Sequence, residues 1–399
     1  MDHRPMDTGT CGPPGAAVRP AHLLHVFPTF AYGGVPIRIA GVINHFGCRY
    51  RHTVFALDGN LAAGSRLDPA LAVRLADPGI AKGGLVGPLA AIARRLAAER
   101  PDLLLTYNWG SIEWALANTL LRRRPHIHFE SGFGPEETDR QIPRRVWARR
   151  LALCGARCLV VPSFTLAAIA RDVWRLPAAR IRHIPNGVDC ALFAAPPVPP
   201  PVAGFARHPG EIVVGTVAPL RAEKNVARLL RAFARTQPGI PARLLIAGDG
   251  PERPALEALA ASLGLGDRAV FLGHVERPET VYPLMDIFAL SSDTEQMPNT
   301  LLQAMAAGRT VAAVDVGDVK TLLPPENAAL VMPREDAAGF AAVLDRLADD
   351  AALRSRLGAA NRRHVLARYA RDRMFDAYGA LFDALLAPGL RPGAAVPIR

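Results

Sequence analysis

The sequence predicts an α/β protein built from two similar halves, each a doubly wound parallel sheet with helices on both faces. Apolar, strand-like runs alternate with amphipathic helical stretches along nearly the whole chain, as in βαβ units. The alternation is interrupted at a proline-rich segment, 191–210, and 399 residues exceed one ordinary core. Ligands of such sheets bind beyond the carboxyl ends of the strands, so we expect the site in a central cleft between the halves.

The first half is expected to span residues 21–190. Residues 1–20 contain Pro, Gly and charged residues without an apolar run, so we expect a disordered tail and not a signal peptide. The predicted strands are 22–28, 51–57, 101–108, 126–131, 158–163 and 180–187. The predicted helices are 33–47, 89–100, 143–155 and one that follows residue 163.

The second half is expected to span residues 211–370 after the linker, where proline denies the chain helix and ladder hydrogen bonds. A last helix, 371–387, is expected to complete the first half, before a loose tail at 388–399. The predicted strands are 211–218, 242–250, 269–275, 287–292 and 310–317. The predicted helices are 225–236, 251–264, a short one ending near Met285, one carrying Gln303, 336–349 and 351–368.

The composition limits the possible partners. A formal net charge of +11 favours anionic partners such as nucleotide phosphates or a membrane surface, although a general arginine-rich bias explains it equally well. No nucleic-acid-binding module is recognisable, so we expect no nucleic-acid partner. There is no run of about eighteen uncharged apolar residues to span a membrane. The five scattered cysteines fit a reducing cytoplasm, and Cys154 and Cys158 lack a matching pair for a metal.

The most informative segment runs from Asp293 to Gly308. Glu295 is expected in a loop, and Gln303 follows eight positions later on a helix that Pro298 and Asn299 begin. The start of that helix offers free N–H groups and a positive dipole end to a phosphate. A carboxylate on the approach loop and a polar residue one turn later can hold hydroxyls beside that phosphate. This is a layout for a nucleotide-sugar.

Two further strand-to-helix junctions have suitable chemistry for phosphate. Gly33 and Gly34 permit close backbone approach, although a glycine pair is often a plain turn. Arg221 and Lys224 can neutralise a departing diphosphate, or they lie in a solvated basic loop. The full G-x-G-x-x-G pattern is absent, which argues against a simple dinucleotide dehydrogenase.

Two segments of the first half are candidates for acceptor and membrane contacts. His128 and Glu130 precede two glycines and two more glutamates, and either could orient an acceptor hydroxyl or the transferred sugar; an acidic surface loop is the alternative. The next helix is basic and amphipathic and contains Trp147, which suits a membrane interface, or it packs by its apolar side with its arginines in water. Its arginines are Arg144, Arg145, Arg149 and Arg150.

Together these motifs resemble family 4 glycosyltransferases, which have the GT-B fold. The resemblance covers about residues 22–385 and includes the E-x7-E motif, with Gln303 in place of its second glutamate. The segments FESGFGPEE and TEQMPNTLLQAMAAG are especially similar to the sequences of bacterial members that build exopolysaccharide or lipid-linked glycans. The five landmarks, in the family's order, are GGV (33–35), PNGVD (185–189), EKN (223–225), AGDGPE (247–252) and TEQMP with AMAAG (294–308).

The resemblance implies a retaining transfer from a nucleotide-sugar, most simply UDP- or GDP-linked, to a glycan or lipid-linked acceptor, with no metal or other cofactor. The scattered cysteines add the expectation of a cytoplasmic location, and the basic helix adds that of peripheral contact with the inner face of the plasma membrane. Glu295 would hold the donor sugar, Gln303 the ribose and the backbone of Val275 the base, with the acceptor near His128 and Glu130. The diphosphate would be held by Gly34, Arg221, Lys224 and the backbone of Asn299, Thr300 and Leu301.

Two departures from the family pattern weaken the expected binding of the donor, and a third concerns the catalytic histidine. Ser131 stands where many relatives have His or Asp, so the family's catalytic histidine does not carry over to this sequence. Pro219 stands where the family usually has an arginine, and Gln303 lacks a charge. These leave an alternative open, a degenerate GT-B protein that binds a nucleotide-sugar or a partner enzyme with weak or no transfer. A third class, a nucleotide-sugar 2-epimerase, would need a set of acids and histidine that the sequence does not show.

Overall fold

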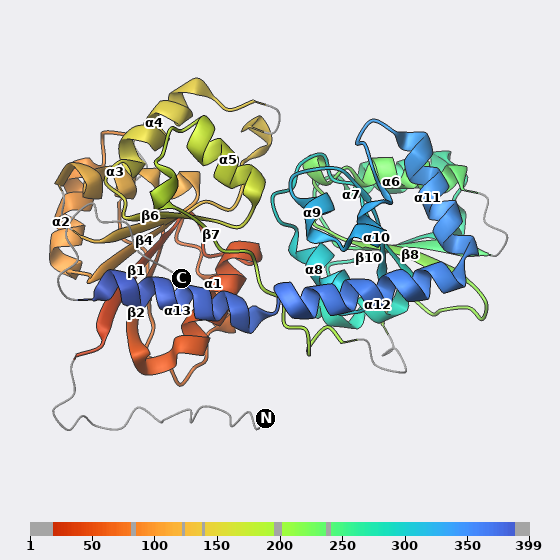
Figure 1. The fold of residues 1–399 in the computed structure, drawn as a ribbon, viewed down its shortest axis with the longest axis horizontal. Coiled ribbons are helices and arrows are strands. Elements are labelled where there is room, and N and C mark those ends of the chain that lie inside the picture. Colours follow the sequence, from red (N-terminus) through yellow and green to blue (C-terminus); the bar gives the residue numbers. More distant parts are fainter. Residues whose placement is uncertain are drawn as a thin grey trace.

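A computed structural model describes residues 19–80, 85–121, 124–137, 140–194, 202–236 and 241–387. The loose tail predicted at 388–399, residues 1–18 of the predicted N-terminal tail and residues 195–201 of the linker lie outside this described part. Figure 1 shows two α/β domains side by side, each with a central sheet between helices. The predicted fold class, two Rossmann-like domains facing a cleft, is confirmed.

The N-terminal domain contains a seven-stranded parallel sheet in the order β3-β2-β1-β4-β5-β6-β7. Its central strands β1 and β4 are buried along almost their whole length because helices cover both faces of the sheet. The short edge strand β3 was not predicted from the sequence. The strands are β1 (Ala21–Phe27), β2 (Tyr50–Ala56), β3 (Arg74–Ala76), β4 (Leu103–Tyr107), β5 (His126–Phe129), β6 (Cys158–Val161) and β7 (Ile181–His183).

Five helices in the described residues of the first half cover this sheet. One of them, α3, was not predicted, because it packs between α2 and α4 and is apolar on nearly every side, which hides the helical period. The helices are α1 (Gly34–Phe46), α2 (Leu89–Glu99), α3 (Ile112–Leu121), α4 (Pro143–Leu153) and α5 (Phe164–Asp172).

The C-terminal domain repeats the same strand order, β10-β9-β8-β11-β12-β13, again all parallel. The short helix predicted near Met285 is instead two 3₁₀ turns, each containing a proline. The strands are β8 (Ile212–Val217), β9 (Ala242–Ala247), β10 (Ala269–Gly273), β11 (Ile287–Leu290), β12 (Thr310–Val314) and β13 (Val331–Met332). The helices are α6 (Val226–Arg235), α7 (Arg253–Ser262), α8 (Asn299–Ala306), α9 (Val319–Leu322), α10 (Pro325–Ala328), α11 (Ala337–Asp349) and α12 (Ala351–Arg368).

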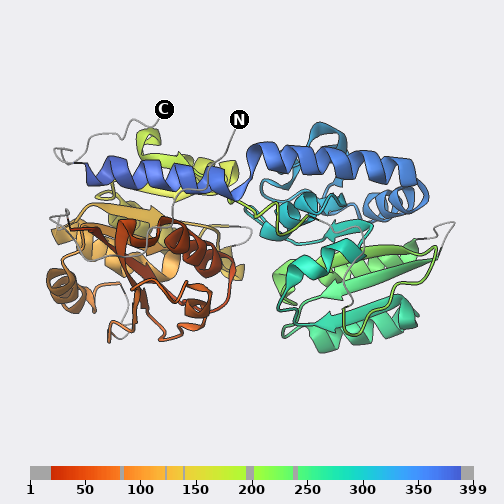
Figure 2. The same cartoon turned by 90° about the horizontal axis from the view of Figure 1, so that it is seen from below.

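The last helix, α13 (Arg371–Leu386), returns to the N-terminal domain. Figure 2 shows α12 and α13 along the same side of the molecule, α12 against one domain and α13 against the other. Met374, Phe375 and Phe382 belong to the same buried cluster as residues of β1 and α1, so α13 is part of the N-terminal core. The chain therefore connects the domains twice.

A layer of buried histidines lies within the N-terminal sheet. His25 shares hydrogen bonds with His52 (3.0 Å) and the Tyr107 hydroxyl (2.8 Å), and the Thr106 hydroxyl lies 2.7 Å from His126 Nε2. Burial lowers the pKa of His52 to about 4 and that of His126 to about 3, and it holds the pKa of His25 well below its usual value. These rings are therefore neutral in the folded domain.

We expect the N-terminal domain to lose stability as the pH falls from about 6.5 toward 4. Over this range the unfolded chain takes up protons on these histidines and the folded domain does not. All four tryptophans lie between residues 109 and 174, so tryptophan fluorescence reports on this domain alone. Its unfolding temperature should be roughly 5–10 °C lower at pH 5 than at pH 7, and an unchanged value would contradict the assignment of neutral rings.

Candidate active site

Two helix N-termini, one from each domain, meet at a cavity of about 660 Å³ between the domains. Gly34 begins α1 and Asn299 begins α8, so unpaired N–H groups and two positive dipole ends face the same space. A Cβ atom added to Gly34 would lie 3.0 Å from Asn299 Nδ2. A glycine here lets the two helix starts approach each other, and together they form a site for an anion.

The structure brings nine of the twelve predicted site residues together around this cavity. They come from the loop before α1, the β8–α6 loop, the segment after β10 and the start of α8, so the carboxyl ends of strands in both domains contribute. The nine are Gly33, Gly34, Arg221, Lys224, Val275, Glu295, Asn299, Thr300 and Gln303.

Lys224 and Glu295 form an ion pair inside the cavity. Lys224 Nζ lies 2.6 Å from Glu295 Oε1, and the Ser292 hydroxyl donates to the same oxygen at 2.8 Å. Both side chains are mostly buried, so their charges interact more strongly than exposed charges would. The cation predicted for phosphate and the carboxylate predicted for sugar are thus each other's partners in this structure.

Gln303 is held by a buried tyrosine. The Tyr282 hydroxyl, which is fully buried, donates to Gln303 Oε1 at 2.7 Å. This bond orients the amide at the cavity wall and satisfies one lone pair of its oxygen, and it leaves the amide N–H₂ group able to donate to a ligand oxygen. A ribose hydroxyl can therefore accept from Gln303, where a glutamate would only accept.

Asn186, in the PNGVD segment, joins the two domains beside the cavity. Its side chain accepts a hydrogen bond from Arg38 and donates to the Met297 carbonyl (3.1 Å) and to Asn299 Oδ1 (3.0 Å). Arg38 Nη2 also donates to Ser131 Oγ at 3.0 Å. The Asn-Gly pair at 186–187 predicts only a tight turn, and no motif of the sequence includes Arg38, so these contacts were not predicted.

Three predicted site residues do not reach the cavity. The side chains of His128 and Glu130 are fully buried, so the expectation that they contact an acceptor is wrong for this structure. His128 Nδ1 shares a hydrogen bond with the Thr106 hydroxyl inside the sheet. The backbone N–H of Leu301 donates to Pro298 O at 3.2 Å and its side chain is buried, so it is also not presented to a phosphate.

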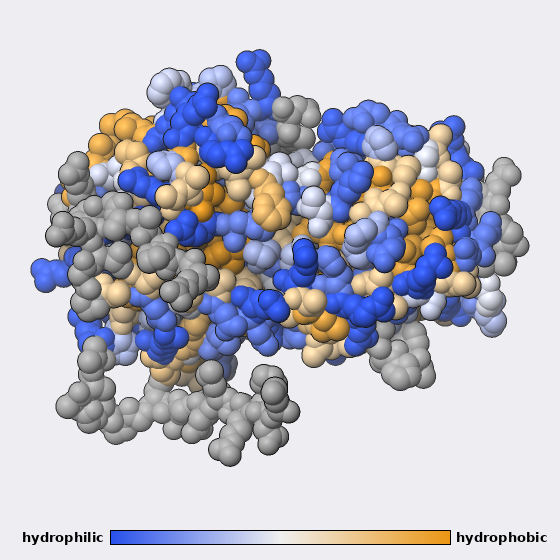
Figure 3. Space-filling view, viewed as in Figure 1, coloured by the Kyte–Doolittle hydropathy of each residue, from blue (hydrophilic) through white to orange (hydrophobic). Residues whose placement is uncertain are grey.

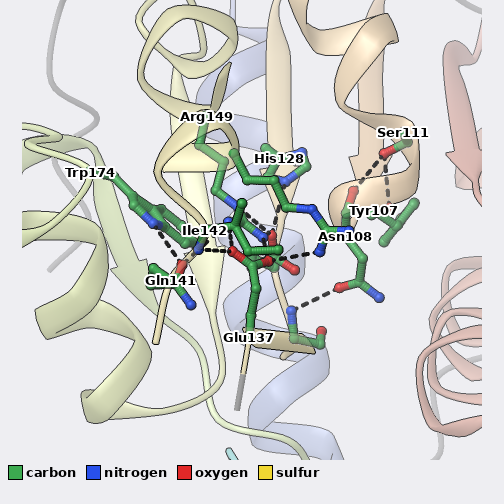
Figure 4. Close-up of polar contacts among 12 residues, drawn as sticks. Tyr107, Asn108, Ser111, His128, Glu137, Gln141, Ile142, Arg149 and Trp174 are labelled. Carbon is green, nitrogen blue, oxygen red and sulfur yellow. Dashed lines mark hydrogen bonds and ion pairs between the residues drawn. The ribbon is translucent and has the colours of Figure 1, made fainter. Parts of the chain in front are cut away.

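Arg149 explains why Glu130 is buried. Figure 4 shows Arg149 of α4 and Glu137 pointing toward each other. The two Nη atoms of Arg149 donate to the two carboxylate oxygens of Glu137 at 3.0 and 2.9 Å. Glu130 Oε2 lies 3.6 Å from Arg149 Nε on the other side. Burial alone would raise the pKa of Glu137, but the Arg149 hydrogen bonds hold it below its usual value. The guanidinium thus lies between two carboxylates.

The predicted lipid contact of the α4 arginines needs correction. Arg149 is fully buried, and the rings of Trp109 and Trp174 each lie 4.9 Å from its guanidinium carbon. Arg145 is ion-paired with Glu137 (3.1 Å), and Arg150 donates to the Val173 carbonyl. Arg144 is the member of the set that the structure leaves exposed.

A second interdomain cavity, of about 930 Å³, adjoins the first, and Glu295 lines both. One wall is formed by α4 and α5 and includes Val146, Trp147 and Ile169. The other is formed by the 293–296 loop and by residues 315–317 and 333–335 of the C-terminal domain. In the described part of the chain, no three His, Cys, Asp or Glu side chains form a metal-binding group.

Two family models cover most of both domains. The model for Glycosyltransferase Family 4 matches residues 32–192, and the model for Glycosyl transferases group 1 matches residues 211–350. The chain belongs to the family 4 glycosyltransferases. The predicted family membership is therefore confirmed.

Curated relatives act in glycan and small-molecule glycosylation. The chain is 32% identical over 225 residues to the lipopolysaccharide core biosynthesis glycosyltransferase LpsD of Rhizobium meliloti, a match that covers 55% of this chain and 63% of that protein. It is 27% identical over 353 residues to the D-inositol 3-phosphate glycosyltransferase of Stackebrandtia nassauensis, covering 79% of this chain and 77% of that protein. The first match thus spans less than two thirds of the relative's length.

Solved structures share the fold of this family 4 chain. The sucrose-phosphate synthase of Thermosynechococcus elongatus superposes with a TM-score of 0.74 at 21% identity, covering 91% of this chain and 99% of that one. HepE of Anabaena, solved in complex with UDP, gives a TM-score of 0.74 at 18% identity, with the same coverages. At these identities the likeness establishes the fold alone.

We expect Glu295→Gln to separate nucleotide affinity from turnover. Removing the charge of Glu295 weakens its hold on Lys224, so calorimetry should show that UDP or GDP binds severalfold more tightly. Transfer from a sugar donor should fall by about a hundredfold or more, because charge-assisted bonds to the sugar are lost. Glu223→Gln removes a charge from the same cavity and is the matched control. Equal or weaker nucleotide binding by Glu295→Gln would contradict the competition for Lys224.

Proposed function

We propose that this family 4 protein is a retaining, metal-independent glycosyltransferase that moves a sugar from a UDP- or GDP-sugar to a glycan or lipid-linked acceptor. The observation that carries the proposal is the convergence of two helix N-termini and Lys224 on one cavity, with Glu295 beside them. The first three groups suit a diphosphate and the fourth suits sugar hydroxyls.

The cavity walls set the direction in which a donor lies. Val275 and Gln303 line the C-terminal wall and would receive the base and ribose. Gly34 and Asn299 then lie where the diphosphate follows, and Glu295 lies where the sugar continues toward the second cavity. Binding of the diphosphate to Lys224 would release Glu295 for the sugar, so donor binding would itself prepare the sugar site.

The proposed absence of a metal rests on the charges that the chain itself supplies. A departing diphosphate gains negative charge in the transition state, and fixed cations and helix dipoles stabilise that charge. Lys224, Arg221 and the N-termini of α1 and α8 would provide this stabilisation without a bound ion. Lys224 is oriented in advance by Glu295, which reduces the reorganisation needed on binding.

Retention would follow from attack on the face from which the diphosphate departs. The bond from the anomeric carbon to the phosphate oxygen breaks, the bond to the acceptor oxygen forms, and the acceptor proton passes to the leaving phosphate oxygen. The burial of His128 and Glu130 supports this assignment, because neither side chain is placed to accept that proton. We therefore assign the base to the leaving phosphate.

The second cavity is the proposed acceptor site. It shares Glu295 with the cavity of about 660 Å³, which we call the donor cavity. An acceptor in the second cavity would therefore approach the sugar from the side of the N-terminal domain. Its lining combines apolar side chains of α4 and α5 with three arginines and five carboxylates. Such a mixed surface suits an amphiphilic acceptor with many hydroxyl groups, which supports a lipid-linked or lipopolysaccharide-type glycan.

A nucleotide-sugar-binding protein without transfer is the second candidate. Pro219 and Gln303 both line the donor cavity. These two differences from the family pattern therefore lie where a donor would bind and not at a distant site. The loss of a charge-assisted bond at Gln303 costs roughly 1–2 kcal/mol, or about tenfold in affinity. Transfer assays distinguish this candidate from an active enzyme.

The decisive experiment is a thermal-shift screen with UDP-, GDP-, ADP- and dTDP-sugars, followed by transfer to an acceptor with and without EDTA. A donor at 100 times its Kd should stabilise the protein by about 2.7 kcal/mol. The anomeric configuration of the product, measured by NMR, should match that of the donor, and EDTA should leave the rate unchanged. Inversion or EDTA sensitivity would reject the proposed mechanism, and donor binding without transfer would favour the second candidate.

We also propose that the protein contacts an anionic membrane surface through the exposed side of α4. The described helices include none that is long and apolar enough to cross a membrane. Trp147 and Leu151 are 68% and 51% exposed and lie one turn apart, with Arg144 beside them. Figure 3 shows hydrophobic surface next to hydrophilic surface along the upper edge of the N-terminal domain, where Figure 1 places α4. An aromatic ring flanked by cations suits such an interface.

Trp147→Ser combined with Leu151→Ser should reduce binding to vesicles of anionic lipid by about tenfold or more, because it removes the exposed apolar contact. Flotation with phosphatidylglycerol and with neutral phosphatidylcholine vesicles is the measurement. Phe164→Ser, at another exposed apolar position on α5, is the control. Equal flotation of the double variant and the wild type would reject this surface.

A further inference from the structure

Arg38 is the cation of the donor cavity that the sequence motifs do not reveal. It lies on the second turn of α1, lines the cavity and is partly buried. Its Nη atoms donate to the neutral side chains of Asn186 and Ser131. Its Nε is buried and has no hydrogen-bond partner among the described residues.

The charge of Arg38 is not neutralised within the part of the chain that the structure describes. The ion pairs found there join other arginines to carboxylates and include none with Arg38. Lys224, by contrast, faces Glu295 at 2.6 Å. Removing an arginine charge from water without a counter-charge is unfavourable. A partly buried guanidinium that ends in two neutral acceptors is therefore suited to receive an anion.

The position of Arg38 indicates which phosphate of a nucleotide it would bind. Asn186 accepts from Arg38 and donates to Asn299, the first residue of α8, so Arg38 is two hydrogen bonds away from that helix start. Val275 and Gln303, where the nucleoside would bind, belong to the opposite domain. A nucleotide extending from that wall brings its second phosphate, not its first, closest to the wall of α1.

We propose that Arg38 binds the second phosphate of the nucleoside diphosphate and is the residue that distinguishes diphosphates from monophosphates. This inference rests on the proposed function, since it assigns a residue within the same donor site. A planar guanidinium can give two parallel N–H bonds to phosphate oxygens. In that position it strengthens binding of the donor and stabilises the departing diphosphate during transfer.

Arg38 can also replace the phosphate-binding charge that is missing at Pro219. Proline has neither a charge nor an N–H group at this position on the wall of the C-terminal domain. Arg38 supplies a guanidinium from the other domain instead. A phosphate held between Arg38 on α1 and the N-terminus of α8 contacts both domains, so the same bond that binds the donor also holds the cleft together.

The test is calorimetry of UDP and UMP, with GDP and GMP in parallel, on the wild type, Arg38→Met and Arg38→Lys. Arg38→Met should weaken the diphosphate about ten- to a hundredfold, since it removes charge-assisted hydrogen bonds, and change the monophosphate less than about threefold. The diphosphate affinity of Arg38→Lys should lie between those of the wild type and Arg38→Met, because lysine keeps the charge but lacks the planar guanidinium. Arg94→Met, at an exposed arginine of α2, is the matched control and should bind as the wild type does.

The possible results separate the inference from the proposed function on which it rests. If the wild type binds none of the nucleotides, the proposed function fails. If the wild type binds a diphosphate and Arg38→Met keeps the same ratio of diphosphate to monophosphate affinity, the Arg38 assignment fails while the proposed function stands. A parallel loss of both nucleotides also overturns the assignment, because it shows that Arg38 positions the domains and does not contact the phosphate. Tryptophan fluorescence confirms that each variant is folded.

Discussion

The donor cavity depends on the bonds that Asn186 makes across the domain boundary. A cavity built from two domains has a fixed shape only if something sets their separation, and here one amide contacts Arg38 on one side and Met297 and Asn299 on the other. Asn186 is almost fully buried, so these bonds are little weakened by competing water. The close approach of Gly34 to Asn299 then follows from this spacing. This spacing places the two helix N-termini at the same cavity.

The charges around the cavity fall into two classes that behave differently before a ligand arrives. Lys224 and Glu295 neutralise each other, which keeps both in place at little cost in desolvation. Arg38 is held by neutral groups and keeps its full charge for an incoming anion. The ion pair keeps the two side chains ordered, and the unpaired charge of Arg38 attracts an anion. A site made of free cations alone would repel itself and be less well ordered, whereas one made of ion pairs alone would have little net attraction for a diphosphate.

The sequence predicted the fold class, and most of the site residues that it predicted line one cavity, because both follow from local patterns. Alternating apolar runs define the two sheets, and strand-to-helix junctions identified Gly34, Lys224 and Glu295. The errors have physical causes. The helix α3 is apolar on nearly every side, so its sequence shows no clear helical period. His128 and Glu130 follow a strand as site residues often do, but Arg149, nineteen positions after Glu130, draws that carboxylate into the interior. Arg38 and Asn186 acquire their roles only when segments 148 residues apart come together.

The N-terminus of α5 has its cap on the other domain. Asp318, from the C-terminal domain, accepts hydrogen bonds from the backbone N–H groups of Phe164 (2.6 Å) and Thr165 (3.0 Å), and Ser163 donates to Gln296 nearby. Ser163 also caps α5 from within its own domain through Leu166. Separating the domains would remove the Asp318 carboxylate from the helix start, at a cost of about 1 kcal/mol for a lost cap. The stability of the first turn of α5 is therefore coupled to the contact between the two domains, because the carboxylate that satisfies its N–H groups belongs to the C-terminal domain.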